Sequence, residues 1–140
     1  MTKRILSLDI SSVSTGYCIF EDEKLIAYDT IIMKQKLHGE RLVFFENTIN
    51  DIIDKYEPNC CFIETIWSGP SPATFRTLAM FHGTVYKICF ERFKSDPGSF
   101  VPSQARKLVG DKVDVKLHAS KKDKLETGKD AKTLAFDFIV

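Results

Sequence analysis

Two acidic residues each follow a short apolar run, and this placement suggests metal-ion chemistry. Asp9 comes directly after residues 5–8, and Glu64 comes directly after residues 60–63. Apolar runs of this length are typical of buried strands. Two carboxylates at neighbouring strand ends would repel each other, and a divalent cation between them is an economical way to offset that repulsion. The pair therefore predicts a site for a hard cation with oxygen ligands.

Asp9 taken alone has two interpretations. It precedes a turn rich in small residues, residues 10–16, and a second expected strand, residues 17–20. An aspartate at the end of a strand can cap its own turn, because its carboxylate accepts hydrogen bonds from nearby backbone N–H groups. The second carboxylate at a matching strand end, Glu64, favours the metal-ligand interpretation.

The hydrophobic periodicity predicts an α/β domain. The expected strands are residues 5–8, 17–20, 24–32, 60–64 and 99–101, and the expected helices are residues 39–56, 73–93, 105–109 and 129–140. A right-handed crossover through the first helix would place strand 60–64 parallel to the first strand, with Asp9 and Glu64 near neighbouring strand ends. We therefore expect a five-stranded mixed sheet, three antiparallel strands then two parallel ones, flanked by helices. A length of 140 residues predicts one domain.

Each long helix has an expected inner face. Apolar residues at three- and four-residue steps define these faces: Leu42, Phe45, Ile49, Ile52, Ile53 and Tyr56 in the first helix, and Phe75, Leu78, Ala79, Val85 and Cys89 in the second. Gly83 lies inside the second helix, where it costs about 1 kcal/mol relative to alanine. We therefore expect another backbone to pack closely against it.

Composition indicates an ordinary globular protein. Apolar residues make up 44% and charged residues 28%, and no apolar run is long enough to span a membrane. The N-terminus has no secretory signal. The four cysteines have no Cys-x-x-Cys spacing and lie in apolar segments, which predicts reduced, buried thiols in a cytoplasmic protein and argues against a zinc site.

The charge is unevenly distributed. Residues 1–100 carry 11 Lys/Arg against 13 Asp/Glu, whereas residues 101–140 carry 9 against 6. The basic residues of the second part are Arg106, Lys107, Lys112, Lys116, Lys121, Lys122, Lys124, Lys129 and Lys132. They form either a solvated lysine-rich loop or a surface for a nucleic-acid backbone.

Four segments, in order, resemble the RuvC-type Holliday junction resolvases of the RNase H-like superfamily. Asp9 followed by residues 14–17 (Ser-Thr-Gly-Tyr) resembles the opening Asp…Thr-Gly motif, and residues 62–65 resemble the second acidic motif. Residues 71–83 resemble the helix that follows it, and residues 101–110 the segment that carries a basic residue toward the active site. The resemblance covers nearly the whole chain and implies an RNase H-like fold.

The resemblance also implies a function. It implies a crossover junction endodeoxyribonuclease that hydrolyses phosphodiesters in four-way or branched DNA with Mg²⁺, or Mn²⁺ as a substitute. Asp9 and Glu64 would be catalytic metal ligands, and the basic pair Arg106 and Lys107 would contact the scissile phosphate. The DNA-binding residues implied are Trp67, Arg106, Lys107, Lys129 and Lys132, although a tryptophan in such a loop is equally a packing anchor. A homodimer would match the substrate's two-fold symmetry. The expected location is the cytoplasm of a bacterial or phage-infected cell.

The sequence departs from the family at its first turn and at its end, and its loop of residues 111–128 is longer than in many relatives. Ser11 stands where the family usually has glycine, and the family's final acidic helix, with its Asp-x-x-Asp pattern, is not found. Asp130 and Asp137 are seven residues apart, which does not match that pattern. We therefore interpret residues 129–140 as the helix that precedes the family's final acidic helix. The domain of residues 1–140 is expected to lack that final helix. The alternatives are a catalytically incomplete DNA-binding module, or a nucleotide-binding, actin-like ATPase relative with residues 11–15 as its phosphate loop.

The lysine-rich part gives a first testable prediction. Replacing Lys121, Lys122 and Lys124 together with glutamine should weaken binding to branched DNA and flatten its dependence on salt. Each lost phosphate contact should lower the slope of log K against log salt by about 1. Fluorescence anisotropy over a salt series measures this slope, and an unchanged slope would mean that the loop is merely solvated.

Overall fold

The computed structural model describes residues 2–66 and 71–100. The chain divides into two units, Met1–Ser99 and Phe100–Val140, and all the described residues except Phe100 belong to the first. The strands are β1 (Arg4–Asp9), β2 (Ser14–Glu21), β3 (Lys24–Ile32), β4 (Cys60–Glu64) and β5 (Gly98–Phe100), and the helices are α1 (His38–Tyr56) and α2 (Pro72–Phe93).

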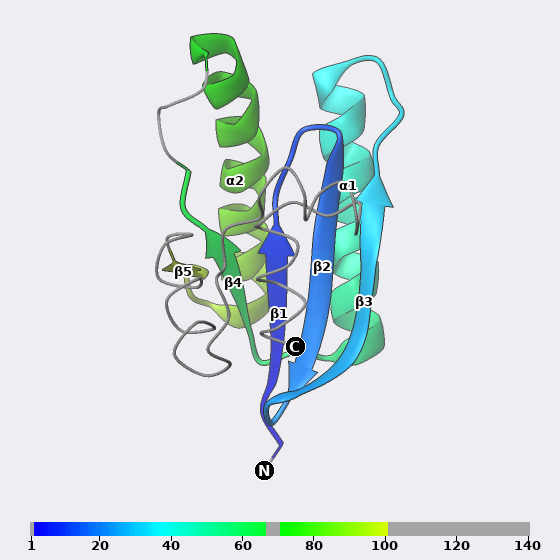
Figure 1. Ribbon diagram of the computed structural model, residues 1–140, viewed down its shortest axis with the longest axis vertical. Coiled ribbons are helices and arrows are strands. Elements are labelled where there is room, and N and C mark those ends of the chain that lie inside the picture. Colours follow the sequence, from blue (N-terminus) through cyan, green and yellow to red (C-terminus); the bar gives the residue numbers. More distant parts are fainter. Residues whose placement is uncertain (1, 67–70, 101–140) are drawn as a thin grey trace, which may run out of the picture. The chain divides into compact units, whose positions relative to one another are not determined.

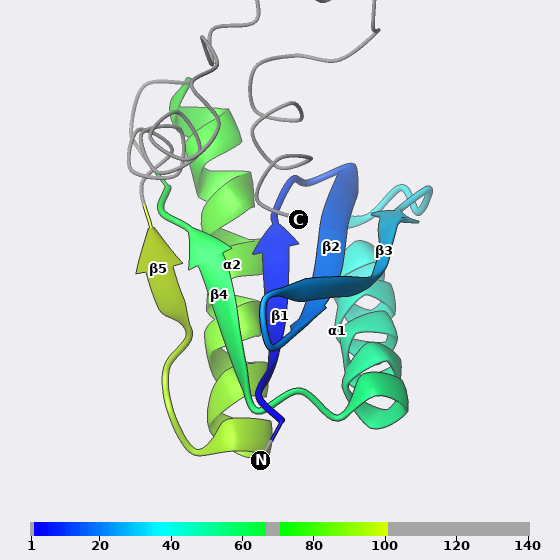
Figure 2. The same cartoon turned by 60° about the horizontal axis from the view of Figure 1, so that its bottom comes forward.

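The strands form one sheet in the order β3-β2-β1-β4-β5 (Figure 1). β1 pairs antiparallel with β2, and β2 antiparallel with β3, whereas β1 pairs parallel with β4. Figure 2 shows β5 running in the same direction as β4. The parallel pairing follows from α1, which carries the chain back so that β4 enters the sheet beside β1. The predicted mixed sheet is therefore confirmed.

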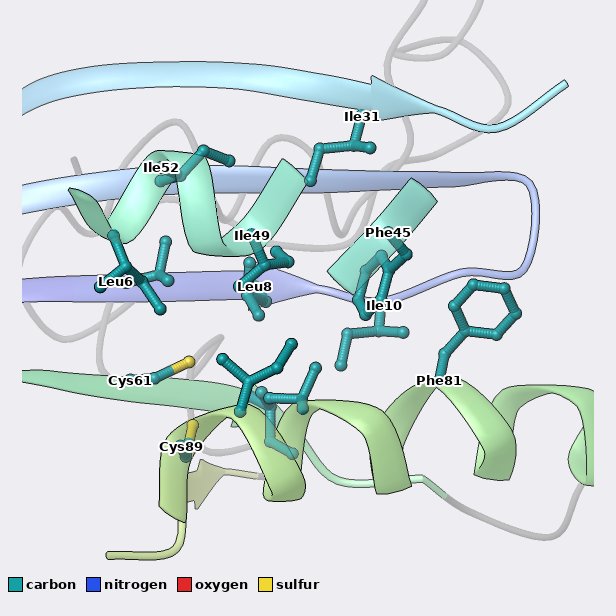
Figure 3. Close-up of a cluster of buried hydrophobic side chains, with 14 of the residues drawn as sticks. Leu6, Leu8, Ile10, Ile31, Phe45, Ile49, Ile52, Cys61, Phe81 and Cys89 are labelled. Carbon is teal, nitrogen blue, oxygen red and sulfur yellow. The ribbon is translucent and has the colours of Figure 1, made fainter. Parts of the chain in front are cut away.

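Both helices pack on the same face of the sheet. The inward side chains of the central strands alternate with outward ones, so that Leu6, Leu8 and Ile63 are buried against the helices. Figure 3 shows this core, where Phe45 of α1 and Phe81 of α2 meet edge to face with ring centroids 5.2 Å apart. Asp9, Phe62 and Glu64 lie on the opposite face because they occupy the alternate positions.

The helix ends follow local chemistry. The Ser71 hydroxyl accepts a hydrogen bond from the Thr74 N–H, and Pro72 follows it at the first position of α2. α1 ends where Glu57 adopts a left-handed conformation and its N–H donates to the Ile53 carbonyl at 2.8 Å. The end of α1 thus sets the short connection into β4, and the Ser71 cap sets the start of α2.

Several expectations were wrong in detail. β2 begins at Ser14 rather than at residue 17, because Thr15 is fully buried and Gly16 already pairs with Asp9. Phe75 and Ala79 are exposed rather than on the inner face of α2. A side chain at Gly83 would meet nothing within 4 Å, so among the described residues no backbone packs there. The last strand covers Gly98–Phe100, whereas residue 101 and the two helices predicted after it lie outside the described residues.

The cysteines are free, and three of them are buried. Cys18, Cys61 and Cys89 are buried, whereas Cys60 is half-buried. Burial raises the pKa of the Cys18 thiol to about 12, which disfavours the reactive thiolate. The prediction of reduced, buried thiols is thus confirmed for three of the four. Neither helix in residues 2–66 and 71–100 has the length and apolar character that crossing a membrane requires.

The contact between β4 and β5 gives a prediction. A Cβ at Gly98 would overlap the Phe62 ring, with even the farthest of three ring carbons only 2.9 Å away. Gly98→Ala should therefore lower the free energy of unfolding by about 1–3 kcal/mol, as measured by urea denaturation. Gly39→Ala is the control, because a Cβ there meets nothing within 4 Å and alanine favours helix by up to about 1 kcal/mol. Equal stability of the two variants would show that Phe62 does not rest on Gly98.

Candidate metal centre

Asp9 and Glu64 lie opposite each other at the ends of two parallel neighbouring strands. The β1–β4 register pairs Leu8 with Ile63, and Asp9 and Glu64 are the next residue on each strand. Paired strands are about 4.8 Å apart, and residues in register on parallel strands project from the same face. Both side chains are half-buried. The predicted placement of the two acids on adjacent strands is confirmed.

Gly16 flanks Asp9 on its other side. It is the β2 partner of Asp9, and a Cβ at this glycine would lie 3.9 Å from the Asp9 Cβ. Asp9 therefore has a second acid on one side and bare backbone on the other.

The turn after Asp9 is closed by hydroxyl groups. The Thr15 hydroxyl donates to the Ser11 carbonyl at 3.3 Å and accepts from the Ser11 N–H at 3.4 Å. The Ser11 hydroxyl accepts from the Val13 N–H at 3.3 Å, a local contact that serine commonly makes in turns. Ser11 is not among the non-glycine residues with a left-handed backbone. The departure from the family's glycine therefore requires no strained conformation here.

Arg41 ties the same turn to α1, a contact that sequence reasoning missed. Its Nη1 donates to the Ser12 carbonyl at 3.2 Å, while its Nη2 donates to His38 Nδ1 at 2.6 Å. The Met33 N–H also donates to the Val13 carbonyl at 2.9 Å. The bonds to Ser12 and Val13 join residues far apart in sequence, so no local pattern could have predicted them.

His82 contacts the other acidic strand end, and it was also missed. The ring is only 9% exposed. Its Nδ1 is 3.0 Å from the Leu78 carbonyl oxygen of α2, and its Nε2 is 3.1 Å from the Glu64 carbonyl oxygen of β4. The available signal was a polar residue on the apolar face of a helix, between Leu78 and Val85.

The acid pair fits a hard divalent cation. Carboxylate oxygens are the ligands that Mg²⁺ prefers, and two of them on one side of an ion leave other positions for water and substrate. Within the described residues no group of three or more His, Cys, Asp or Glu side chains could hold a metal. The remaining predicted site residues, Trp67, Arg106, Lys107, Lys129 and Lys132, lie outside the described residues, as do Asp130 and Asp137.

Comparison with known proteins identifies the family. The family described as crossover junction endodeoxyribonuclease RuvC matches residues 5–119, which include both acids. The chain belongs to the RuvC family. Both acids lie inside the matched range, and their roles as motif residues remain predictions.

Comparisons with individual proteins support the same family. The crossover junction endodeoxyribonuclease RuvC of Hydrogenovibrio crunogenus is 28% identical over 112 residues, which span 76% of this chain and 64% of that protein. Thermus thermophilus RuvC in complex with a Holliday junction substrate has a TM-score of 0.69 at 13% identity, covering 98% of this chain and 91% of that one. The yeast mitochondrial Holliday junction resolvase Ydc2 has a TM-score of 0.63 at 15% identity, covering 94% and 63%. These structures confirm the RNase H-like fold.

The acid pair generates a prediction about stability. A ligand that binds the folded state raises the free energy of unfolding, by about 2.7 kcal/mol at 100 times its Kd. Asp9→Asn should remove this gain in Mg²⁺ or Mn²⁺, because it removes one of the two carboxylates. Urea denaturation with and without metal measures the effect.

The matched control is Asp51→Asn, which neutralises an exposed acid on α1 and should keep the gain of the unaltered protein. If the Asp9→Asn protein were stabilised by metal as strongly as the Asp51→Asn protein, Asp9 would not be a ligand.

Proposed function

We propose that this protein is a Holliday junction resolvase, a metal-dependent endonuclease that cuts four-way or branched DNA by phosphodiester hydrolysis. The observation that carries the proposal is the in-register pair Asp9 and Glu64 in a chain of the RuvC family. A solved relative of the same fold, T. thermophilus RuvC, is in complex with a Holliday junction substrate. The match to the H. crunogenus protein spans 64% of that protein, so activity, substrate and partners remain proposals.

The roles of the residues follow from their chemistry. Asp9 and Glu64 hold Mg²⁺, which supplies Lewis acidity and lowers the pKa of a bound water when present. Asp9 would be a ligand common to both ions if two bind, as the family resemblance implies, and Glu64 would hold one of them. Arg106 or Lys107 contacts the scissile phosphate, and Trp67 stacks on unpaired bases at the branch point. Lys129 and Lys132 contact the DNA backbone.

Cleavage of a labelled four-way junction tests this proposal. In Mg²⁺ the active protein should cut the junction in preference to a linear duplex of the same sequence, and Asp9→Asn should abolish cutting while leaving binding intact. The chain of residues 1–140 should bind Mg²⁺ weakly and cut poorly, and a chain extended by an acidic C-terminal helix should cut well. Full cleavage by residues 1–140 would show that Asp130 or Asp137 completes the site.

A different result would favour the alternative function. Tight, branch-selective binding without cutting, even by the extended chain, would identify a DNA-binding module with an incomplete site. Failure to distinguish the junction from the linear duplex would contradict both.

We also propose that two copies associate through α2. One side of this helix carries an exposed stripe of apolar and small residues, namely Phe75, Ala79, Gly83, Tyr86 and Phe90. At about 100° per residue these five positions fall within an arc of about 80°. Phe90 is 62% exposed, and an apolar stripe of this kind on a helix surface is typical of an interaction site.

The stripe is symmetric in sequence, which favours a second copy as its partner. Phe75 and Phe90 lie equally far on either side of the bond between residues 82 and 83, and so do Ala79 and Tyr86. An antiparallel two-fold crossing at this point would pair Phe75 with Phe90 of the second copy, and the reverse, as an isologous interface requires. Gly83 lies at the crossing, where the absence of a side chain lets two helices approach closely.

Gly83→Lys tests the dimer. A side chain at Gly83 meets nothing within 4 Å, so lysine fits one copy but blocks the crossing between two. Sedimentation equilibrium should show a monomer for this variant at concentrations where the unaltered protein is a dimer. Gly39→Lys is the matched control, because this helical glycine is equally open, and it should stay dimeric. Identical association of the two variants would place the interface elsewhere.

A further inference from the structure

His82 links α2 to the residue that ends β4. One ring nitrogen is 3.0 Å from the Leu78 carbonyl oxygen, one turn earlier in the same helix, and the other is 3.1 Å from the Glu64 carbonyl oxygen. Both neighbours are backbone acceptors, and a neutral imidazole carries a single N–H, so the tautomer decides which contact is a hydrogen bond. The tautomer with the proton on Nε2 donates to the Glu64 carbonyl oxygen. Buried polar side chains in a helix usually have such partners, but here one partner belongs to a metal-ligand residue of the proposed site.

The backbone of Glu64 stands at the margin of the sheet. The pairing of β4 with β1 runs from Cys60 to Ile63, and after Glu64 the chain leaves the sheet into the loop that precedes α2. Strand ends are held less firmly than strand centres because they have fewer neighbours. A side chain from the packed face of α2 that bonds the Glu64 carbonyl therefore restrains the strand end from the side opposite to its carboxylate.

We infer that His82 is a positioning residue that fixes the main chain of Glu64, and thereby sets where the Glu64 carboxylate stands relative to Asp9. The inference rests on the proposed function, because it assigns a role toward the metal that these two acids hold. Groups that orient a ligand typically change metal affinity or activity by 10–100-fold when removed. His82 touches neither substrate nor metal in this account, so its effect passes through Glu64.

The two contacts of His82 can be separated by substitution. Glutamine places its side-chain N–H₂ near the position of the histidine Nε2, so His82→Gln keeps a donor for the Glu64 carbonyl. Asparagine places its N–H₂ near the position of Nδ1, so His82→Asn keeps only a donor for Leu78. Both are polar amides of similar chemistry. A comparison of the two therefore tests the bond to β4 and not merely the loss of a histidine.

The control for general damage to α2 is Val85→Ala. Val85 is 1% exposed on the same face, one turn after His82, and its truncation loosens the core without touching Glu64. Two properties are compared at a temperature where all variants are folded. The first is the affinity for Mn²⁺, measured by calorimetry without DNA. The second is the kcat and KM for junction cleavage by the active full-length protein.

The Asn variant should bind Mn²⁺ at least about tenfold more weakly than the unaltered protein. Its kcat should fall while its KM for DNA stays unchanged, and higher metal concentrations should restore part of its rate. The Gln and Val85→Ala variants should keep the affinity of the unaltered protein.

Equal affinity of the Asn and Val85→Ala variants would overturn the inference, as would equal losses in the Asn and Gln variants. If the Asn variant does not fold, a folded Gln variant with tenfold weaker binding overturns it as well. An unaltered protein that binds no metal would overturn the proposed function together with the inference, whereas metal binding that is indifferent to His82 would overturn the inference alone.

Discussion

The alignment of two acidic residues at adjacent strand ends is the constraint on which this account of the site depends. Asp9 and Glu64 cannot move apart, because the β1–β4 register that aligns them lies in the middle of the sheet. That register exists because α1 returns the chain in parallel and buries Phe45 and Ile49 against the same sheet face. Two like charges at this separation destabilise the fold unless a cation or hydrogen bonds offset them. The fold therefore brings two acidic side chains together at the ends of two inner strands.

Hydrogen bonds from neighbouring elements support the backbone next to Asp9 and Glu64. Thr15 and Arg41 fix the turn that continues from Asp9, through hydrogen bonds to the carbonyls of Ser11 and Ser12. His82 lies beside the strand end at Glu64. These contacts involve backbone groups of the turn and of the strand end. Rigid support of the backbone next to ligand residues is the arrangement expected of a site whose geometry must be preorganised.

Much of this arrangement could be predicted from the sequence, because its signals are local. A strand followed by an acid occurs twice, and the apolar period of residues 39–56 made the crossover helix and hence the parallel pairing predictable. The inner face of α2 was only partly predicted, since Phe75 and Ala79 belong to a second apolar stripe that sequence periodicity does not separate from the buried one. Contacts such as Arg41 with Ser12 join distant segments and leave no local pattern. The predicted roles of Arg106, Lys107 and Trp67 remain predictions.

The central claim is that Asp9 and Glu64 bind the same ion, and a double-mutant cycle on metal affinity tests it most directly. The change in Mn²⁺ Kd is measured by calorimetry for Asp9→Asn, for Glu64→Gln and for the double variant. If the two carboxylates share an ion, the losses are strongly non-additive, and the double variant binds little worse than the weaker single one. Losses that simply add, or a single variant with unchanged affinity, would show that the two acids do not act on one ion and would contradict the account.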